Sequence, residues 1–173
     1  MAIRYIINNQ IVNAWFLLHQ VCDSSAKCEE ALFAEVGVSI PQFLVMASIK
    51  LNKGPITLSS IVNILDRHPN TISNIVARMK NVGLIESIRN SDDRREYILK
   101  ITPKGEKKFK EACVVARALP RKIFSVLSDE EIAVLGDILY KTRENTFVFR
   151  NIRDKVKTVD TRRNKAAVEI FGK

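Results

Sequence analysis

Two short amphipathic helices are predicted in the middle of the chain. Apolar side chains recur at helical spacing over residues 58–65, and Thr57 is a residue type that caps a helix start. Pro69 interrupts this pattern, because proline disfavours helical geometry in the residue before it yet suits the first position of a new helix. The pattern therefore predicts one helix that begins after Thr57 and a second that begins at Pro69.

The second of these helices has one apolar side and several polar ones. Its apolar side chains are Ile72, Ile75, Val76 and Met79. The side chains on its other faces are Asn70, Thr71, Ser73, Asn74, Arg78 and Asn81. No acidic residue occurs between Arg67 and Asn81, which suits a phosphate-lined groove, and amides and hydroxyls suit base edges. An ordinary amphipathic surface helix has the same pattern, so both interpretations stay open on this segment alone.

A β-hairpin is predicted after the second helix. Gly83 is typical of a helix end, and a short strand and a polar run follow it. The chain then alternates with period two over residues 97–101, as a strand does. Arg94 and Arg95 lie at the tip, where an arginine can enter a minor groove. Arginine-rich loops are often only solvated, but the position of this one after two helices favours DNA contact.

The order of these elements and their residues resemble the winged helix-turn-helix core of MarR-type transcriptional regulators. That family carries the signature Asp-x-Arg, a short strand, then Leu-Thr-x-x-Gly. The matching residues here are Asp93, Arg95, Ile101, Thr102 and Gly105, with isoleucine in place of the usual leucine. The resemblance covers about residues 6–149 and implies a homodimer that binds double-stranded DNA. We expect Asp93 to hold the hairpin, or wing, in shape and Arg95 to contact the minor groove.

The chain departs from the family pattern at three places. An arginine is common in the family where this chain has Asn74, and another is common where it has Ser87. Without them the DNA-facing surface is expected to be less basic than usual. The turn between the two helices reads Asp66-Arg67-His68 and contains no glycine.

Helices on both sides of this core predict a second lobe. A stripe of apolar residues that includes Trp15 predicts a helix over about residues 5–24, and Ser39 begins a capping-box pattern that opens another. Thr102-Pro103 opens a long helix in which Pro120 is expected to cause a kink or a break. Ser128 begins a second capping box. Apolar stripes at both chain ends favour pairing with a second copy, which the family resemblance also implies.

The predicted fold class is mainly α with a small β-hairpin wing (α+β), a winged helix-turn-helix lobe and a helical dimerisation lobe. The expected boundaries are a MarR-like domain over 1–149, with its winged core at about 56–102, dimerisation helices at about 5–24 and 103–149, and a basic tail at 150–173. The tail has eight Lys or Arg against three acids. A solvated tail, one that contacts phosphates and one that wraps the partner subunit are all compatible with this composition.

Charge and hydropathy narrow the functional classes. The 173 residues carry a formal net charge of +9, which favours a polyanionic partner such as nucleic acid. No apolar run approaches the ~20 residues that span a bilayer, and the first ten residues lack the apolar stretch of a signal peptide. We therefore expect a cytoplasmic protein with no membrane partner.

Soft metal ligands and reactive thiols are few. His19, Cys22 and Cys28 form the pattern H-x2-C-x5-C near the end of the predicted first helix, which suggests a redox pair or a weak metal site. The spacing matches no strong zinc pattern, and a cytosolic disulfide would be regulatory. Cys113 lies on an apolar helical stripe and is expected to be a buried structural thiol.

Enzymatic function is not expected, because the chain has no G-x-S-x-G, phosphate-binding glycine loop, H-E-x-x-H or dense carboxylate cluster. No cofactor is expected. The favoured hypothesis is a dimeric, sequence-specific repressor that binds an inverted-repeat operator. The alternatives are a basic architectural DNA-binding protein and a winged helix used for protein contacts. The resemblance also implies a small-molecule effector between the lobes, near Trp15, Phe43 and Val45, although we expect these three residues to belong to the core.

Overall fold

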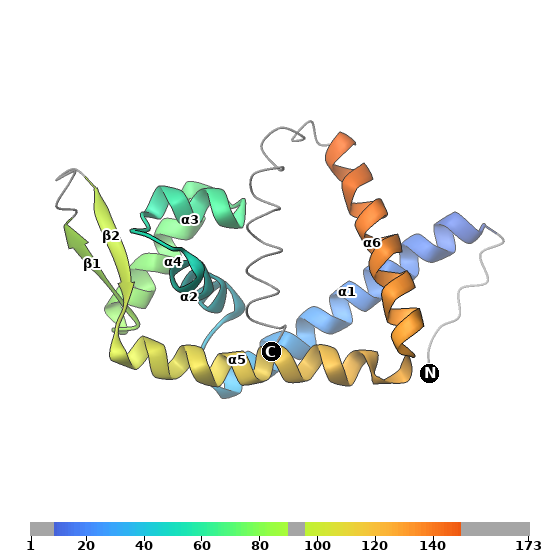
Figure 1. Cartoon of the computed structure of the whole chain (residues 1–173), viewed down its shortest axis with the longest axis horizontal. Coiled ribbons are helices and arrows are strands. Elements are labelled where there is room, and N and C mark those ends of the chain that lie inside the picture. Colours follow the sequence, from blue (N-terminus) through green and yellow to red (C-terminus); the bar gives the residue numbers. More distant parts are fainter. Residues whose placement is uncertain (1–8, 90–95, 150–173) are drawn as a thin grey trace.

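The computed structural model describes residues 9–89 and 96–149 as helices and one antiparallel hairpin (Figure 1). The elements in chain order are α1 (Gln10–Glu35), α2 (Ile40–Leu51), α3 (Leu58–Leu65), α4 (Pro69–Asn81), β1 (Ile85–Arg89), β2 (Tyr97–Ile101), α5 (Pro103–Ile123), a 3₁₀ turn (Phe124–Val126) and α6 (Asp129–Phe149). The predicted fold class, mainly α with a small β-hairpin, is confirmed.

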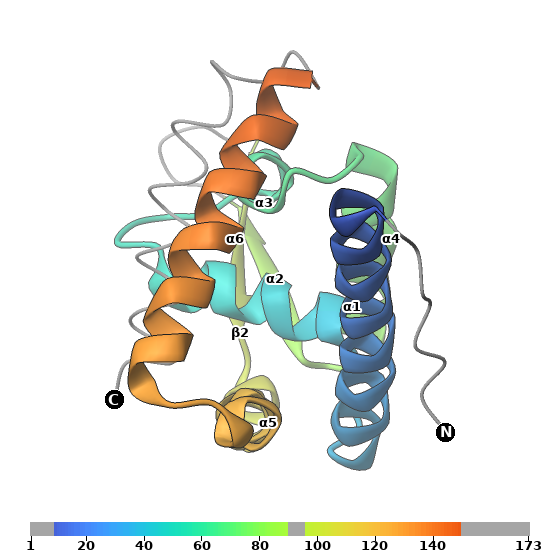
Figure 2. The same ribbon diagram turned by 90° about the vertical axis from the view of Figure 1, so that its right-hand side faces the viewer.

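One lobe contains α2, α3, α4 and the hairpin, while α5 runs along its edge and continues beyond it (Figure 1). From another side, α1 and α6 stand as two upright helices with α2 visible between them (Figure 2). The lobe packs around side chains with no exposed surface, including Met46, Ile61 and Met79. Phe43 of α2 joins the helices around it, since its ring lies 5.2 Å from that of Phe33 on α1 and 5.5 Å from that of Phe109 on α5.

Local sequence signals explain where these helices begin. The Thr57 hydroxyl accepts a hydrogen bond from the Ser60 amide and caps α3. Ser39 and Gln42 form the predicted capping box at α2, and Ser128 and Glu131 form the one at α6. These predictions are confirmed.

The start of α4 and the turn before it are built without glycine. Asp66 adopts the left-handed conformation, with φ of 49°, and lets the chain reverse between α3 and α4. The ring nitrogen Nδ1 of His68 then accepts a hydrogen bond from the Asn70 amide at 3.3 Å, and Pro69 occupies the first turn. The predicted start of the second helix is thus confirmed, and Asp66 takes the place that glycine often fills.

The end of α4 is a Schellman motif. Gly83 has φ of +71°, its amide donates to the Lys80 carbonyl at 3.0 Å, and the Leu84 amide donates to the Met79 carbonyl at 2.9 Å. The chain enters β1 directly from this turn. Gly83 is therefore needed for its backbone conformation, as its position after the predicted helix suggested.

The hairpin presents one face to the lobe. Ile85 pairs with Ile101, Ser87 with Leu99, and Arg89 with Tyr97, so these six side chains share a face. Leu99 is buried, and its amide donates to the Ile56 carbonyl at 2.9 Å. Burial decreases from the base of the hairpin toward its other end, where Tyr97 at the start of β2 is 56% exposed.

Two expected helix boundaries were wrong. The sequence predicts the first helix at about residues 5–24, but α1 continues to Glu35. Its second half is mostly polar but still buries Phe33, and no helix-breaking residue occurs before Gly37. The expected break at Pro120 is wrong, because α5 continues to Ile123, and a kink at Pro120 stays a prediction. Pro120 lies in the last turn, so its missing amide removes one hydrogen bond where the helix is about to end.

Candidate nucleic-acid interface

The polar face of α4 is open to solvent over its whole length. The six polar residues singled out from the sequence, Asn70, Thr71, Ser73, Asn74, Arg78 and Asn81, are all exposed. On the opposite side Ile72, Val76 and Met79 are buried in the lobe, so α4 has no freedom to rotate. The helix contains no acidic residue. The structure thus presents amides, hydroxyls and a guanidinium together on one rigid surface.

Hydroxyls at the start of α3 lie next to this surface, since Thr57 and Ser59 line the same groove as Ser73 of α4, and the sequence pattern does not indicate them as binding residues. The Thr57 hydroxyl lies 2.8 Å from that of Ser59 and 3.1 Å from that of Ser60. The pattern around Thr57 indicates only a helix cap, because a cap and a surface hydroxyl have the same local sequence.

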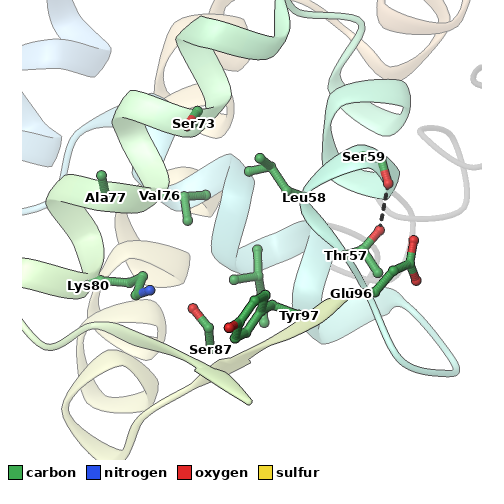
Figure 3. A pocket seen from close by; sticks show the side chains of 11 residues that line it. Thr57, Leu58, Ser59, Ser73, Val76, Ala77, Lys80, Ser87, Glu96 and Tyr97 are labelled. Atoms are coloured by element: carbon green, nitrogen blue, oxygen red, sulfur yellow. Dashed lines mark hydrogen bonds between the residues drawn. The ribbon is translucent and has the colours of Figure 1, made fainter. Parts of the chain in front are cut away.

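A groove of about 490 Å³ separates α4 from the hairpin (Figure 3). The residues that line it are Thr57, Leu58, Ser59, Ser73, Val76, Ala77, Lys80, Ser87, Glu96, Tyr97 and Leu99. Leu58, Val76 and Leu99 give it an apolar floor, and polar side chains surround that floor. At one end the polar ends of Lys80, Ser87 and Tyr97 point toward one another, while Glu96 lies at the other end with Thr57 (Figure 3).

The sequence pattern does not indicate Lys80, Glu96 and Tyr97 as site residues. They lie on α4, just before β2, and on β2, so only the packing of the hairpin against α4 brings them to one groove. The period-two pattern did place Tyr97 and Leu99 on the same face of the strand. That pattern does not show which element packs opposite this face of the strand.

A set of hydrogen bonds fixes the end of α4 to the start of α5. The Thr102 hydroxyl donates to the Gly83 carbonyl at 2.6 Å, and the Thr102 amide donates to the Leu84 carbonyl at 3.1 Å. The same hydroxyl accepts from the Gly105 amide at 3.1 Å, and Lys104 Nζ donates to the Val82 carbonyl at 2.7 Å. We call these contacts the α4–α5 clamp. Through it, Thr102 and Gly105 of the family signature set the position of α4 relative to α5.

The wing tip lies outside the described residues. Asp93, Arg94 and Arg95 all fall within the segment 90–95, so their predicted roles stay predictions. The expected basic tail at 150–173 also lies outside the described part of the chain.

The His19, Cys22 and Cys28 pattern does not form a site within one chain. Cys22 and Cys28 are exposed, six residues apart on the continuous helix α1. A rise of 1.5 Å per residue separates their Cα atoms by about 9 Å, which is too far for a disulfide. Among the described residues, no group of three or more His, Cys, Asp or Glu side chains is arranged to hold a metal. Cys113 is partly buried, and burial raises the pKa of its thiol, which agrees with a structural role.

Large apolar side chains are exposed on α1 and α6. On α1 they are Ile11, Val12, Trp15, Phe16, Leu17 and Val21, and on α6 Ile132, Val134, Ile138, Leu139 and Tyr140. Trp15 is 56% exposed, so its expected place in the core was wrong, whereas Phe43 and Val45 are buried as expected. None of the side chains described on α6 is buried. A helix of this length that exposes apolar side chains and buries none over residues 129–146 is typical of a subunit interface.

No single helix in the described part of the chain is both long and apolar enough to cross a membrane. Helices α1 and α2 are long and apolar enough only when they are counted together, and the chain bends by 76° between them.

Comparisons with known proteins give one consistent family. A profile described as "MarR family" matches residues 38–97. The transcriptional repressor MdtR of Bacillus subtilis is 30% identical over 105 residues, which are 61% of this chain and 67% of that protein. The transcriptional regulator MgrA of Staphylococcus aureus is 32% identical over 75 residues, which are 43% of this chain and 50% of MgrA, so the match spans half of that relative.

Solved structures show the same fold. A mutant MarR from E. coli in complex with operator DNA superposes with a TM-score of 0.68 at 21% identity, over 78% of this chain and 96% of that one. The organohalide-sensing regulator RdhR, in its 2,4-dichlorophenol-bound form, superposes with a TM-score of 0.69 at 20% identity, over 84% of this chain and 90% of that one.

Proposed function

Since the chain belongs to the MarR family of transcriptional regulators, we propose that it is a dimeric repressor that binds an inverted-repeat operator. The proposed role is regulatory, not catalytic. We place the protein in the cytoplasm, where the operator is accessible. A small-molecule effector is part of the same proposal, supported by the structural neighbour with bound 2,4-dichlorophenol.

The observation that carries this proposal is the exposed polar face of α4. A helix with a free polar face and no carboxylate can enter a major groove. There, asparagine amides pair with adenine, and serine and threonine hydroxyls contact hydrogen-bond donors or acceptors on the base edges. We assign base contacts to Asn70, Thr71, Ser73 and Asn74, and phosphate contact to Arg78. The wing arginines Arg94 and Arg95 complete the proposed surface in the adjacent minor groove.

The exposed apolar side chains of α1 and α6 support the dimer. We propose that these two helices and the C-terminal part of α5 pack against the same elements of a second copy. Two copies of α4 would then face successive major grooves on one side of a duplex, with half-sites about one helical turn, ~10 base pairs, apart. Sedimentation at micromolar protein should show a dimer. A monomer at that concentration would contradict the arrangement.

The decisive experiment compares two duplexes at matched salt by fluorescence anisotropy. One comes from the region upstream of the protein's own gene, and the other is a scrambled duplex of the same composition. A repressor of its own gene should bind the first about 1000-fold or more tightly than the second. Equal affinity for both would favour the architectural alternative. Failure to bind either duplex would favour a protein-interaction module.

A further inference from the structure

Three hydrogen-bond donors meet at one end of the groove between α4 and the hairpin. Lys80 comes from the last turn of α4, Ser87 from β1 and Tyr97 from β2. Figure 3 shows the ammonium group and the two hydroxyls directed toward a common space above the hairpin. The short side chain of Ser87 leaves this space open toward Lys80.

None of these three side chains has a hydrogen-bond or ion-pair partner among the described residues. Other described lysines, such as Lys53 and Lys110, also have no partner, so the distinguishing feature of Lys80 is that two hydroxyls converge with it. An ammonium and two hydroxyls that converge without an acceptor form a favourable place for an anion, because hydrogen bonds to a charged oxygen are stronger than neutral ones.

The opposite end of the groove has the opposite charge. Glu96 lies there beside Thr57 and Ser59, whose hydroxyls hydrogen-bond to each other at 2.8 Å. A carboxylate repels an anion, so an anionic ligand is directed to the end that carries Lys80. The groove is therefore polarised along its length.

We propose that Lys80, Ser87 and Tyr97 hold one phosphate of the operator strand that passes between α4 and the hairpin. This inference rests on the proposed function. If α4 lies in the major groove and the wing tip in the neighbouring minor groove, the sugar-phosphate strand that divides the two grooves crosses the space between them. Lys80 neutralises the phosphate, and the hydroxyls of Ser87 and Tyr97 fix its position along the strand.

Two substitutions separate charge from geometry. Lys80→Ala should weaken binding roughly tenfold and reduce the slope of log affinity against log salt by about 0.9, because one phosphate contact is lost. Tyr97→Phe keeps the ring and removes one hydroxyl, so it should weaken binding about threefold and leave the salt slope unchanged. Both side chains lie at the surface, and melting temperatures would confirm that the variants fold. The matched control is Lys110→Ala, which removes the same charge from the exposed side of α5.

The partner phosphate can be located with operator duplexes that carry a neutral methylphosphonate at one position at a time. The full-length protein should lose affinity at several positions. At one position next to the wing, Lys80→Ala should lose no further affinity, because its contact is already absent, while Lys110→Ala should behave like the unaltered protein at every position. Additive losses at all positions would overturn the proposal.

A free anion is the competing occupant, and inorganic phosphate at constant ionic strength tests for it. If phosphate ions weaken DNA binding by the unaltered protein but not by Lys80→Ala, and no methylphosphonate couples to Lys80, the site holds a free anion and the proposal fails. Failure of the proposed function gives a different result. In that case the unaltered protein binds operator and scrambled duplexes equally, while Lys80→Ala still lowers the salt slope on both.

Discussion

Substitution of Gly105 by alanine should disrupt the α4–α5 clamp. A Cβ at this position would lie 2.0 Å from the Leu84 carbonyl oxygen and 2.7 Å from Cγ2 of Ile101. The first neighbour is backbone, so no side-chain rotation can relieve the clash. Either the start of α5 or the turn after α4 has to move.

The magnitude follows from what that movement breaks. Overpacking of a tight site costs about 1–3 kcal/mol. The two hydrogen bonds that Thr102 donates to the Gly83 and Leu84 carbonyls, at 2.6 and 3.1 Å, would also lengthen, and each contributes about 1 kcal/mol. We therefore expect Gly105→Ala to lower the free energy of unfolding by about 3 kcal/mol. For a protein of this size that corresponds to a fall in Tm of roughly 6–12 °C.

Thermal unfolding followed by circular dichroism measures this effect. All variants need the same protein concentration, because the stability of a dimer depends on it. Gly54→Ala is the matched control, since a Cβ there meets nothing within 4 Å and the change should stay within about 0.5 kcal/mol. If Gly105→Ala melts within about 2 °C of the unaltered protein, the backbone contact at Leu84 does not constrain the junction between α4 and α5.

Three further predictions concern DNA binding. Arg95→Ala should weaken operator binding by at least ~1 kcal/mol without a change in Tm, and unaltered affinity would remove Arg95 from the interface. Asn74→Ala should reorder the affinities of operator variants, whereas Arg78→Ala should weaken all duplexes about equally and lower the salt slope by about one unit. An unchanged ranking with Asn74→Ala would mean that another face of α4 reads the bases. Glu96→Gln should tighten binding to every duplex, because it removes a carboxylate from a groove that receives a phosphate, and weaker binding would contradict that placement.

The elements that the sequence predicted well are those with local causes. The start of α3 at Thr57, the capping box at Ser39 and the end of α4 at Gly83 each depend on residues within one turn of the boundary. The hairpin follows from alternation within β2 and a polar run before it. Such features can be predicted from neighbouring residues alone, because they do not depend on contacts between distant segments.

The features that the sequence did not predict depend on contacts between distant segments. Lys80 and Tyr97 are 17 positions apart and line the same groove only because the hairpin folds back on α4. Trp15 lies on an apolar stripe, and a stripe has the same pattern whether its own lobe or a second subunit covers it. The length of α1 depends on Phe33, whose ring packs against Phe43 from another helix.

Because of the α4–α5 clamp, a tilt of α5 at one end displaces α4 at the other. With 21 residues and a rise of 1.5 Å per residue, α5 is about 31 Å long, and its first turn is bonded to the end of α4 while its last turn leads into α6. A tilt of only about 5° at the α6 end would move the α4 end by roughly 3 Å over that length. This is close to the rise of one base pair, 3.4 Å. In the proposed dimer, a small rearrangement where the two subunits meet would therefore be enough to take α4 out of register with its half-site.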